Sequence, residues 1–189
     1  MMDGDCPPLA CGQWRTWQGF RAHLFQHDRH ICNWARGAVI HHTWKPTPGQ
    51  WRGMASMQSL KRYYEGLGWT AGPHLFICAG APNPADDGIW QLTPLNLKGI
   101  HAGVCNATTW GIEVVGDYDK APWSDATSAL VTHAVRALFD WRELDTTPKT
   151  LKGHRDCNSP KTCPGTAINL DYVRPQVLAL DDWGYRYAR

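Results

Sequence analysis

The sequence predicts an α/β fold, a single domain in which helices flank a central mixed β-sheet. Segments with the pattern of strands alternate with segments of helical period, which is typical of layered α/β domains. A short turn separates two of the strand segments and favours an antiparallel pair beside parallel ones. The length of 189 residues suits one domain, which can bury about 70% of its unfolded surface without the support of disulfides or structural metals.

Apolar runs bounded by turn residues mark the expected strands. Polar residues and a loop rich in proline follow the first run, and a turn at residues 83–88 joins the second run to the third. A last, short strand leads into the segment that is richest in reactive side chains. The expected strands are Gly37–Thr43, Pro73–Cys78, Ile89–Leu92, Trp110–Val115 and Thr150–Lys152.

Apolar residues at three- and four-residue intervals mark the expected helices. The first follows its cap Thr16 through about Gln26, and the longest follows its cap Ser124 to about Glu143. Pro175 is expected to start or interrupt the last helix. The remaining two helices are expected over residues 54–66 and 171–180.

The N-terminal segment differs in composition from the rest. Residues 1–15 are rich in Pro, Gly and Asp and are expected to wrap around the domain or fray. We therefore divide the chain into an extension with a short helix, residues 1–35, packed on a main domain of residues 36–189. Within that domain, Met54 and Met57 are expected to fill the core rather than form a binding stripe.

Composition excludes several classes of function. Charged residues are 19% of the chain and the formal net charge is +2, which is too small to indicate a nucleic-acid partner. No stretch approaches the ~18 apolar residues of a membrane span, and the start lacks the pattern of a signal peptide. We therefore expect no membrane insertion and a location in the cytoplasm of the producing cell.

The cysteines indicate a reducing compartment. The seven cysteines are odd in number and irregular in spacing, which argues against a full disulfide framework. Reduced thiols in a cytosol are the simpler interpretation.

The reactive side chains concentrate in residues 152–165, which contain His154, Lys161 and Cys163. Pro164 favours an extended Cys163, so Lys161 and Cys163, two residues apart, should face one cavity. The separation of His154 from Cys163 does not match a zinc finger, and a metal site here needs a ligand from elsewhere. A structural His and Cys in a proline-rich loop is the alternative.

A third ligand is available at the end of the first strand. His41 and His42 are adjacent there, and their side chains must point to opposite faces, so only one of them can reach a given metal. A pair of histidines satisfied by local hydrogen bonds is the alternative.

Glu113 is a candidate general base, because a carboxylate among apolar strand residues is costly unless it has a function. Burial raises the pKa of a carboxylate toward the range useful for a base. The alternative is a Glu at a sheet edge or paired with a Lys or Arg. His74, His101 and Asn106 are candidate substrate-binding residues, although polar surface residues are the more common case.

Four motifs together resemble a known family, and the resemblance covers residues 36–178. They are the strand end Ile40-His-His-Thr, the strand Gly72-Pro-His-Leu-Phe-Ile, the run from His101-Ala-Gly to Gly111-Ile-Glu-Val-Val-Gly, and Gly153-His-Arg-Asp followed by Lys161-Thr-Cys-Pro-Gly. In this order they are similar to the zinc-dependent N-acetylmuramoyl-L-alanine amidases. These are the type 2 amidases, which share a fold with peptidoglycan recognition proteins.

The resemblance implies a role for each matched residue. His41, His154 and Cys163 would bind Zn²⁺ and leave a fourth position for water. Glu113 would be the base, and Lys161 the cation beside the scissile carbonyl. Cys157 lacks the Lys-x-Cys-Pro-Gly context and is interpreted as a non-ligand.

One position departs from the family. Many phage members and zinc-binding recognition proteins have a tyrosine where this chain has Pro73. The phenol that could assist the oxyanion is therefore missing. Members without that tyrosine commonly carry the Glu of the Gly-Ile-Glu strand, as this chain does.

The expected function is hydrolysis of the amide between N-acetylmuramic acid and L-alanine, by a monomeric phage or prophage endolysin whose partner is peptidoglycan. Alternatives are a non-lytic recycling amidase on soluble muropeptides and a recognition module that only binds peptidoglycan. A structural zinc domain is disfavoured, because such sites usually close with four protein ligands. Most of the eleven tryptophans are expected in the core, with a sugar-binding cleft as the alternative for some of them.

Overall fold

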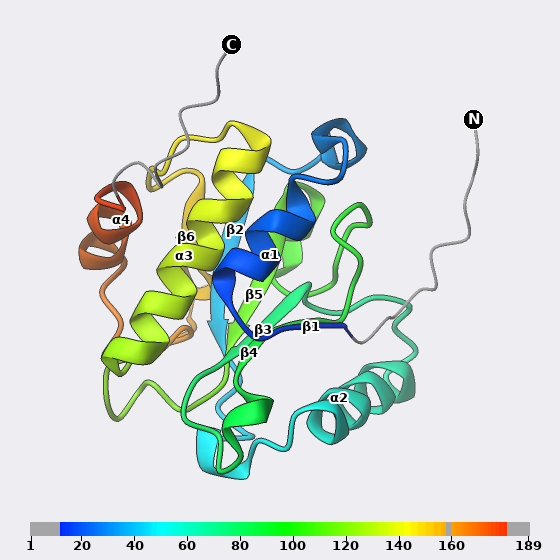
Figure 1. Ribbon diagram of the computed structural model, residues 1–189, viewed down its shortest axis with the longest axis vertical. Helices are drawn as coiled ribbons and strands as arrows, with labels where there is room; N and C mark the ends of the chain where they lie inside the picture. Colours follow the sequence, from blue (N-terminus) through cyan, green and yellow to red (C-terminus); the bar gives the residue numbers. More distant parts are fainter. Residues whose placement is uncertain (1–11, 158–159, 181–189) are drawn as a thin grey trace.

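The structure, a computed structural model, describes residues 12–157 and 160–180 (Figure 1). These residues form one six-stranded sheet with four α-helices, which confirms the predicted α/β class. The strands are β1 (Gly12–Trp14), β2 (Gly37–His42), β3 (Leu75–Cys78), β4 (Gly88–Gln91), β5 (Thr109–Val114) and β6 (Leu151–Gly153). The α-helices are α1 (Trp17–Leu24), α2 (Met54–Gly66), α3 (Asp125–Arg142) and α4 (Leu170–Leu178).

The sheet is mixed, with the strand order β1-β4-β3-β5-β2-β6. Strands β3, β5, β2 and β6 run parallel, whereas β4 is antiparallel to both of its neighbours. The antiparallel pair β3–β4 is consecutive in the chain, as the predicted turn requires. Parallel strands need longer crossover connections, and α2 lies on the connection from β2 to β3 and α3 on the connection from β5 to β6.

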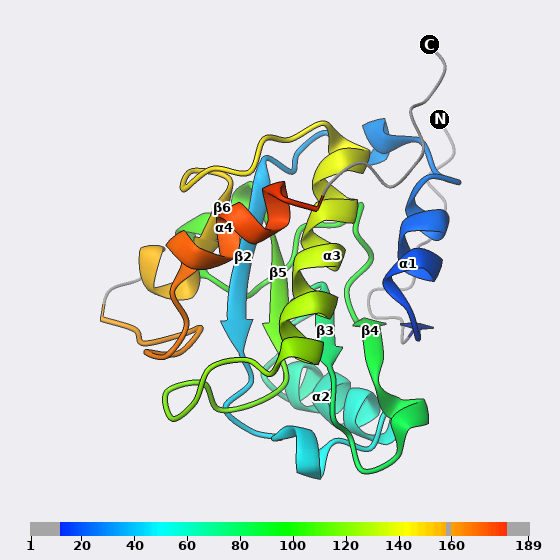
Figure 2. The same cartoon turned by 60° about the vertical axis from the view of Figure 1, so that its left-hand side comes forward.

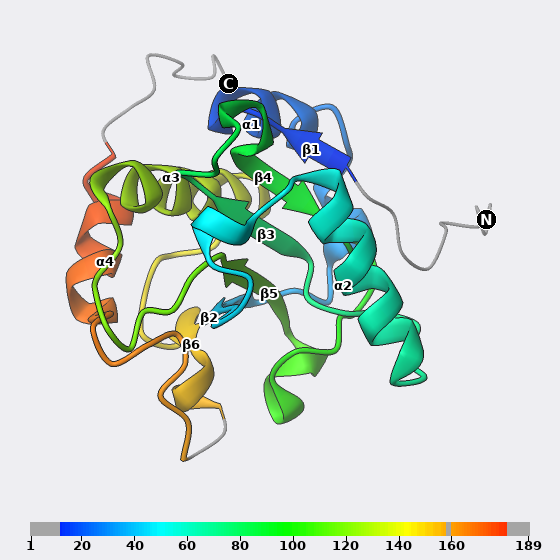
Figure 3. The same ribbon diagram turned by 90° about the horizontal axis from the view of Figure 1, so that it is seen from below.

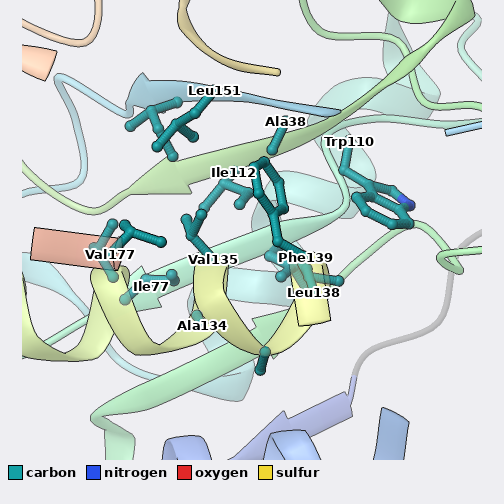
Figure 4. Close-up of a cluster of buried hydrophobic side chains, with 14 of the residues drawn as sticks. Ala38, Ile77, Trp110, Ile112, Ala134, Val135, Leu138, Phe139, Leu151 and Val177 are labelled. Carbon is teal, nitrogen blue, oxygen red and sulfur yellow. The ribbon is translucent and has the colours of Figure 1, made fainter. Parts of the chain in front are cut away.

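Helices α1, α3 and α4 cover one face of the sheet (Figure 2). Side chains alternate along a strand, so every second residue of the central strands points into this layer. Figure 4 shows Ala38, Ile112 and Leu151 of the strands in one cluster with Val135 and Leu138 of α3, all of them fully buried. Burying an aliphatic side chain of this kind stabilises the fold by roughly 1.5–3 kcal/mol.

Helix α2 packs on the opposite face, over β3 and β4 (Figure 3). Met57 is fully buried there with Phe76 and Trp90, as expected. Met54 is 40% exposed, so the prediction that both methionines fill the core is wrong for Met54. Helical spacing puts the two residues on one side of the helix but does not tell how far along it the covering layer extends.

Side chains cap the helices where the sequence predicted them. The Thr16 hydroxyl accepts a hydrogen bond from the Gly19 amide at 3.2 Å, and the Ser124 hydroxyl accepts one from the Thr127 amide at 3.2 Å. The prediction that Pro175 starts or interrupts the last helix is wrong, because Pro175 lies inside α4. No α-helix in the described ranges is long and apolar enough to cross a membrane.

Part of the N-terminal segment belongs to the sheet. Residues 1–11 lie outside the described residues. Gly12–Trp14 form the edge strand β1, so the prediction that residues 1–15 wrap around the domain or fray is wrong for these three. Three residues are too few to show an alternating pattern. Helix α1 buries Phe20 and Leu24 in the same core as α3. The boundary between residues 35 and 36 stays a prediction.

One disulfide joins Cys105 to Cys157 across 52 residues of the chain. The expectation of reduced thiols is therefore wrong for this pair, and the pairing explains why Cys157 is no metal ligand. Sequence spacing missed the bond because the two cysteines meet only through the packing of two loops. Among the described residues, Cys32, Cys78 and Cys163 are free.

We expect removal of the disulfide to lower the free energy of unfolding by about 2–4 kcal/mol, because the cross-link restricts the unfolded chain. The measurement is denaturant unfolding of the double variant Cys105→Ser/Cys157→Ser beside the wild type, each with and without dithiothreitol. The reductant should destabilise only the wild type. A wild type that is unaffected by the reductant would contradict the disulfide.

Candidate metal centre and active site

Parallel strands bring His41 and Glu113 together on the face opposite α3. In the β2–β5 register His41 lies beside Glu113, and Phe76 of β3 lies on the other side of Glu113. His42 points the opposite way, where its Nδ1 accepts a hydrogen bond from the Tyr118 amide at 3.1 Å. Only His41 is therefore available to the site, as the alternation of a strand requires.

His154 joins His41 from the neighbouring strand. Strand β6 pairs with β2, and His154 begins a 3-10 helix at the residue that follows β6. The Nδ1 atoms of the two rings lie 3.1 Å apart.

Cys163 completes the group. Its Sγ lies 3.7 Å from Nδ1 of His41 and accepts a long hydrogen bond, 3.4 Å, from the backbone amide of His42. One ligand atom from each of His41, His154 and Cys163 lies within 4.8 Å of the other two. We call these three residues the His–His–Cys cluster.

Backbone contacts hold the loop of Cys163 against His154. The Arg155 amide donates to the Cys163 carbonyl at 2.9 Å, and the Arg155 guanidinium donates to the carbonyls of Thr162, Gly165 and Ile168. Gly153 has no Cβ, and a Cβ there would lie 2.8 Å from Cδ of Pro164. The glycine therefore allows the Cys163 loop to approach the end of β6.

Asp119 fixes the same loop from the opposite direction. Its carboxylate accepts hydrogen bonds from the Thr166 amide at 2.8 Å and from the Thr162 hydroxyl at 3.1 Å. Asp119 and Arg155 were not singled out in the sequence. Arg155 lies in the Gly-His-Arg-Asp motif, which was a signal for it, whereas Asp119 carried none.

Burial keeps the histidines of the cluster neutral. His41 is 2% exposed, and desolvation, followed by the neighbouring His101, His154 and His42, lowers its pKa well below 6.5. Desolvation and then the charge of Lys161 lower the pKa of His154. Desolvation raises the pKa of the Cys163 thiol to about 12, and the Glu113 carboxylate adds to this shift. Neutral imidazoles are the form that binds a metal.

Glu113 is a buried carboxyl group on a central strand. Burial raises its pKa to about 8. Oε1 lies 3.9 Å from Nδ1 of His41, and Oε2 is buried without a hydrogen-bond partner among the described residues. The alternatives of an edge-strand Glu or a Lys or Arg pair are wrong, because β5 is interior and the ion pairs of the described residues give Glu113 only His41.

Lys161 is exposed, and its ammonium lies close enough to the cluster to lower the pKa of His154, after the larger effect of desolvation. Its expected orientation toward one cavity with Cys163 stays a prediction.

His101 and Asn106 lie in the loop between β4 and β5 and are engaged with the protein itself. His101 Nδ1 is 3.0 Å from Nε2 of His41, and His101 Nε2 is 3.0 Å from the Thr109 carbonyl. Desolvation lowers the pKa of His101 to about 4, so the ring is neutral. The Asn106 side-chain oxygen accepts from the amides of His101 and Ala102. Substrate contact by either residue stays a prediction.

His74 is wrongly predicted as a substrate-binding residue. It has no exposed surface, its Nδ1 accepts from the Gly111 amide at 2.9 Å, and its Nε2 donates to the Leu97 carbonyl at 2.9 Å. The ring ties the Leu97 loop to β5. A polar residue at the start of a strand carries no sequence signal that separates this role from ligand contact.

Burial of His74 makes stability depend on pH. Desolvation, the largest cause, lowers its pKa to about 3 from 6.5, so the unfolded chain binds more protons than the folded one between these values. The free energy of unfolding should therefore fall as pH drops from 6.5, by about 1.4 kcal/mol per pH unit from this group. Denaturant unfolding from pH 7 to pH 4.5 should give a shallower slope for His74→Gln. Equal slopes would contradict the buried neutral ring.

Comparisons with known proteins agree with this geometry. The chain is 30% identical to peptidoglycan-recognition protein SC2 of Drosophila melanogaster over 146 residues, 73% of this chain and 72% of that protein. The endolysin amidase LysCS from Clostridium intestinale matches the fold with a TM-score of 0.61 at 21% identity, over 78% of this chain and 86% of that chain. Drosophila PGRP-LB matches with a TM-score of 0.59 at 20% identity, over 82% and 86%.

The family comparison covers the site itself. The family model described as N-acetylmuramoyl-L-alanine amidase matches residues 33–166. This segment is most of the chain and contains the whole His–His–Cys cluster and Glu113. The chain therefore belongs to the N-acetylmuramoyl-L-alanine amidase family.

Proposed function

We propose that this protein is a zinc-dependent amidase that hydrolyses the bond between N-acetylmuramic acid and L-alanine in peptidoglycan. One observation carries the proposal: two buried or half-buried imidazoles and a thiol converge within 4.8 Å of one another, beside a buried carboxyl group. The family supplies the substrate class, and the cluster supplies the reason to expect catalysis. We expect the enzyme to act as a monomer.

The donor set fits zinc. Two nitrogens and one sulfur are ligands of the softness that Zn²⁺ prefers, and three protein ligands leave one position for water. Ligands on a tetrahedral zinc would lie about 3.4 Å apart for two nitrogens and about 3.6 Å apart for nitrogen and sulfur. The separations of 3.1 Å between His41 and His154 and 3.7 Å between His41 and Cys163 are close to these values.

The chain's own residues supply the proton chemistry. A zinc ion held by the cluster would act as a Lewis acid that activates a water molecule and polarises the amide carbonyl. Glu113 accepts the proton of the attacking water and passes it to the leaving amine of L-alanine. Burial raises its pKa to about 8 in the metal-free protein, and the positive charge of a bound zinc would lower it toward neutral pH, where the group could both accept and return a proton. Lys161 places a positive charge where the oxyanion develops.

The relatives include recognition proteins, and the donor set favours catalysis over binding alone. All three residues of the cluster are present together with Glu113, whereas a module that only binds needs none of their chemistry. Incubation with purified peptidoglycan, with zinc and after removal of zinc by a chelator, tests this. We expect new N-terminal alanine amines only with zinc. Binding of peptidoglycan without release of amines would indicate that the protein is a recognition module.

We further propose a phage-type lysin that acts on polymeric cell wall and waits in the cytoplasm of the producing bacterium until it is released. Cys163, in the Lys-x-Cys-Pro-Gly motif, supports this, because the motif resembles phage members more than recycling enzymes. We expect the enzyme to clear suspensions of bacteria stripped of their outer membrane. Cleavage of soluble anhydromuramyl peptides without any clearing would favour the recycling amidase.

A further inference from the structure

The two ring nitrogens of His41 have different partners. Nδ1 faces His154 and Cys163, whereas Nε2 lies 3.0 Å from Nδ1 of His101. A neutral imidazole carries its proton on one nitrogen only. The nitrogen that carries it therefore decides whether Nδ1 of His41 offers a lone pair to a metal or a hydrogen to His154.

The Thr109 carbonyl settles the direction of the hydrogen bonds. It can only accept, so Nε2 of His101, 3.0 Å away, must donate to it. Nδ1 of a neutral His101 then has no hydrogen and can only accept. The hydrogen between His101 and His41 must therefore come from Nε2 of His41, which leaves a lone pair on Nδ1 of His41.

The position of His101 is itself determined by its surroundings. Its amide donates to the side-chain oxygen of Asn106 at 3.0 Å, and the ring lies over Gly111 of β5. A Cβ at Gly111 would lie 2.5 Å from Cγ of His101, so the glycine makes room for the ring. The disulfide from Cys105 to Cys157 ties this loop to the segment after His154.

We propose that His101 is a positioning residue that sets the tautomer of His41, so that Nδ1 of His41 is the atom that binds zinc. The Thr109 carbonyl is the fixed end of this chain of hydrogen bonds. The inference rests on the proposed function for its zinc, but the tautomer itself is a property of the metal-free protein.

Two matched variants separate this role from packing. In His101→Asn, the side-chain oxygen occupies the place of Nδ1 and can still accept from His41, while the donor to Thr109 is lost. In His101→Gln, the side-chain nitrogen occupies the place of Nε2 and can still donate to Thr109, while the acceptor for His41 is lost. A purely structural role would favour Gln, which keeps the larger volume and the bond to β5.

The test combines ring nitrogen NMR of the metal-free proteins with zinc affinity measured by chelator competition. We expect the Nε2–H tautomer of His41 in the wild type and in His101→Asn. In His101→Gln we expect loss of that tautomer and zinc affinity lower by about 10- to 100-fold, as for other lost partners of metal-bound histidines.

An Nδ1–H tautomer of His41 in the metal-free wild type would overturn the inference, and this result does not depend on whether either variant folds. Equal zinc affinities of folded Asn and Gln variants would overturn it as well. A wild-type protein that has the Nε2–H tautomer of His41 but binds no zinc would contradict the proposed function instead. The two failures are therefore distinguishable.

Discussion

Replacement of Cys163 by serine is expected to abolish stoichiometric zinc binding and with it the amidase activity. A serine hydroxyl remains protonated near neutral pH, so the site would lose its only anionic sulfur ligand. We expect zinc affinity to fall by more than about 100-fold, beyond the effect of losing an outer partner of a ligand. Elemental analysis and chelator competition measure both quantities on the purified protein.

The matched control is the double variant Cys105→Ser/Cys157→Ser, which removes sulfur from the same region but none from the cluster. It should be less stable and should still bind one zinc per chain. Retention of one zinc by Cys163→Ser would mean that Cys163 is not a ligand. Loss of zinc in both proteins would instead indicate that zinc binding depends on the fold of the loop rather than on Cys163 as a ligand.

Replacement of Glu113 by glutamine is expected to lower kcat by about 10²- to 10⁴-fold, because an amide cannot accept the proton of the attacking water. Zinc content should stay near one per chain, since Glu113 lies beside the cluster rather than in it. The substitution also removes a buried carboxyl whose Oε2 has no hydrogen-bond partner in the part of the chain that the structure describes. The variant should therefore fold at least as well as the wild type, which thermal unfolding checks.

The matched control for this variant is Glu65→Gln, the same chemical change at an exposed residue of α2 that pairs with Lys61. Its kcat and zinc content should equal those of the wild type. An unchanged kcat in Glu113→Gln would remove Glu113 from the role of base and leave a second water as the proton acceptor. The buried His74, engaged at both nitrogens, does not offer that alternative.

Periodicity predicted the parts of the fold that large apolar residues determine. The central strands and α3 bury one continuous layer, so their patterns are strong and their ranges agree within about a residue or two of the observed ones. Strand β1 was missed because three edge residues show no period. The disulfide between Cys105 and Cys157 was missed for a different reason: it depends on where two loops meet, which no local pattern encodes.

For the site, the sequence could predict which residues offer chemistry but not what each side chain contacts. The alternation of a strand separated His41 from His42, and the apolar context of Glu113 indicated burial. His74 and His101 looked equivalent in the sequence, because both are histidines near strands. In the structure one ties a loop to β5 and the other contacts His41. That difference arises because segments that are far apart in the sequence pack together around each ring.

Mass spectrometry of peptidoglycan digested by the zinc-loaded protein in water enriched in ¹⁸O identifies the bond that the protein hydrolyses. If the muramoyl–alanine amide is hydrolysed, the lactyl carboxylate of the glycan should carry one ¹⁸O. The released peptide stems should be unlabelled and should begin with a free alanine amine. Label at a sugar reducing end would identify a glycosidase, and label in an amino-acid carboxylate would identify a peptidase. Either result, or no product from protein that holds one zinc per chain, would rule out a zinc-dependent muramoyl–alanine amidase.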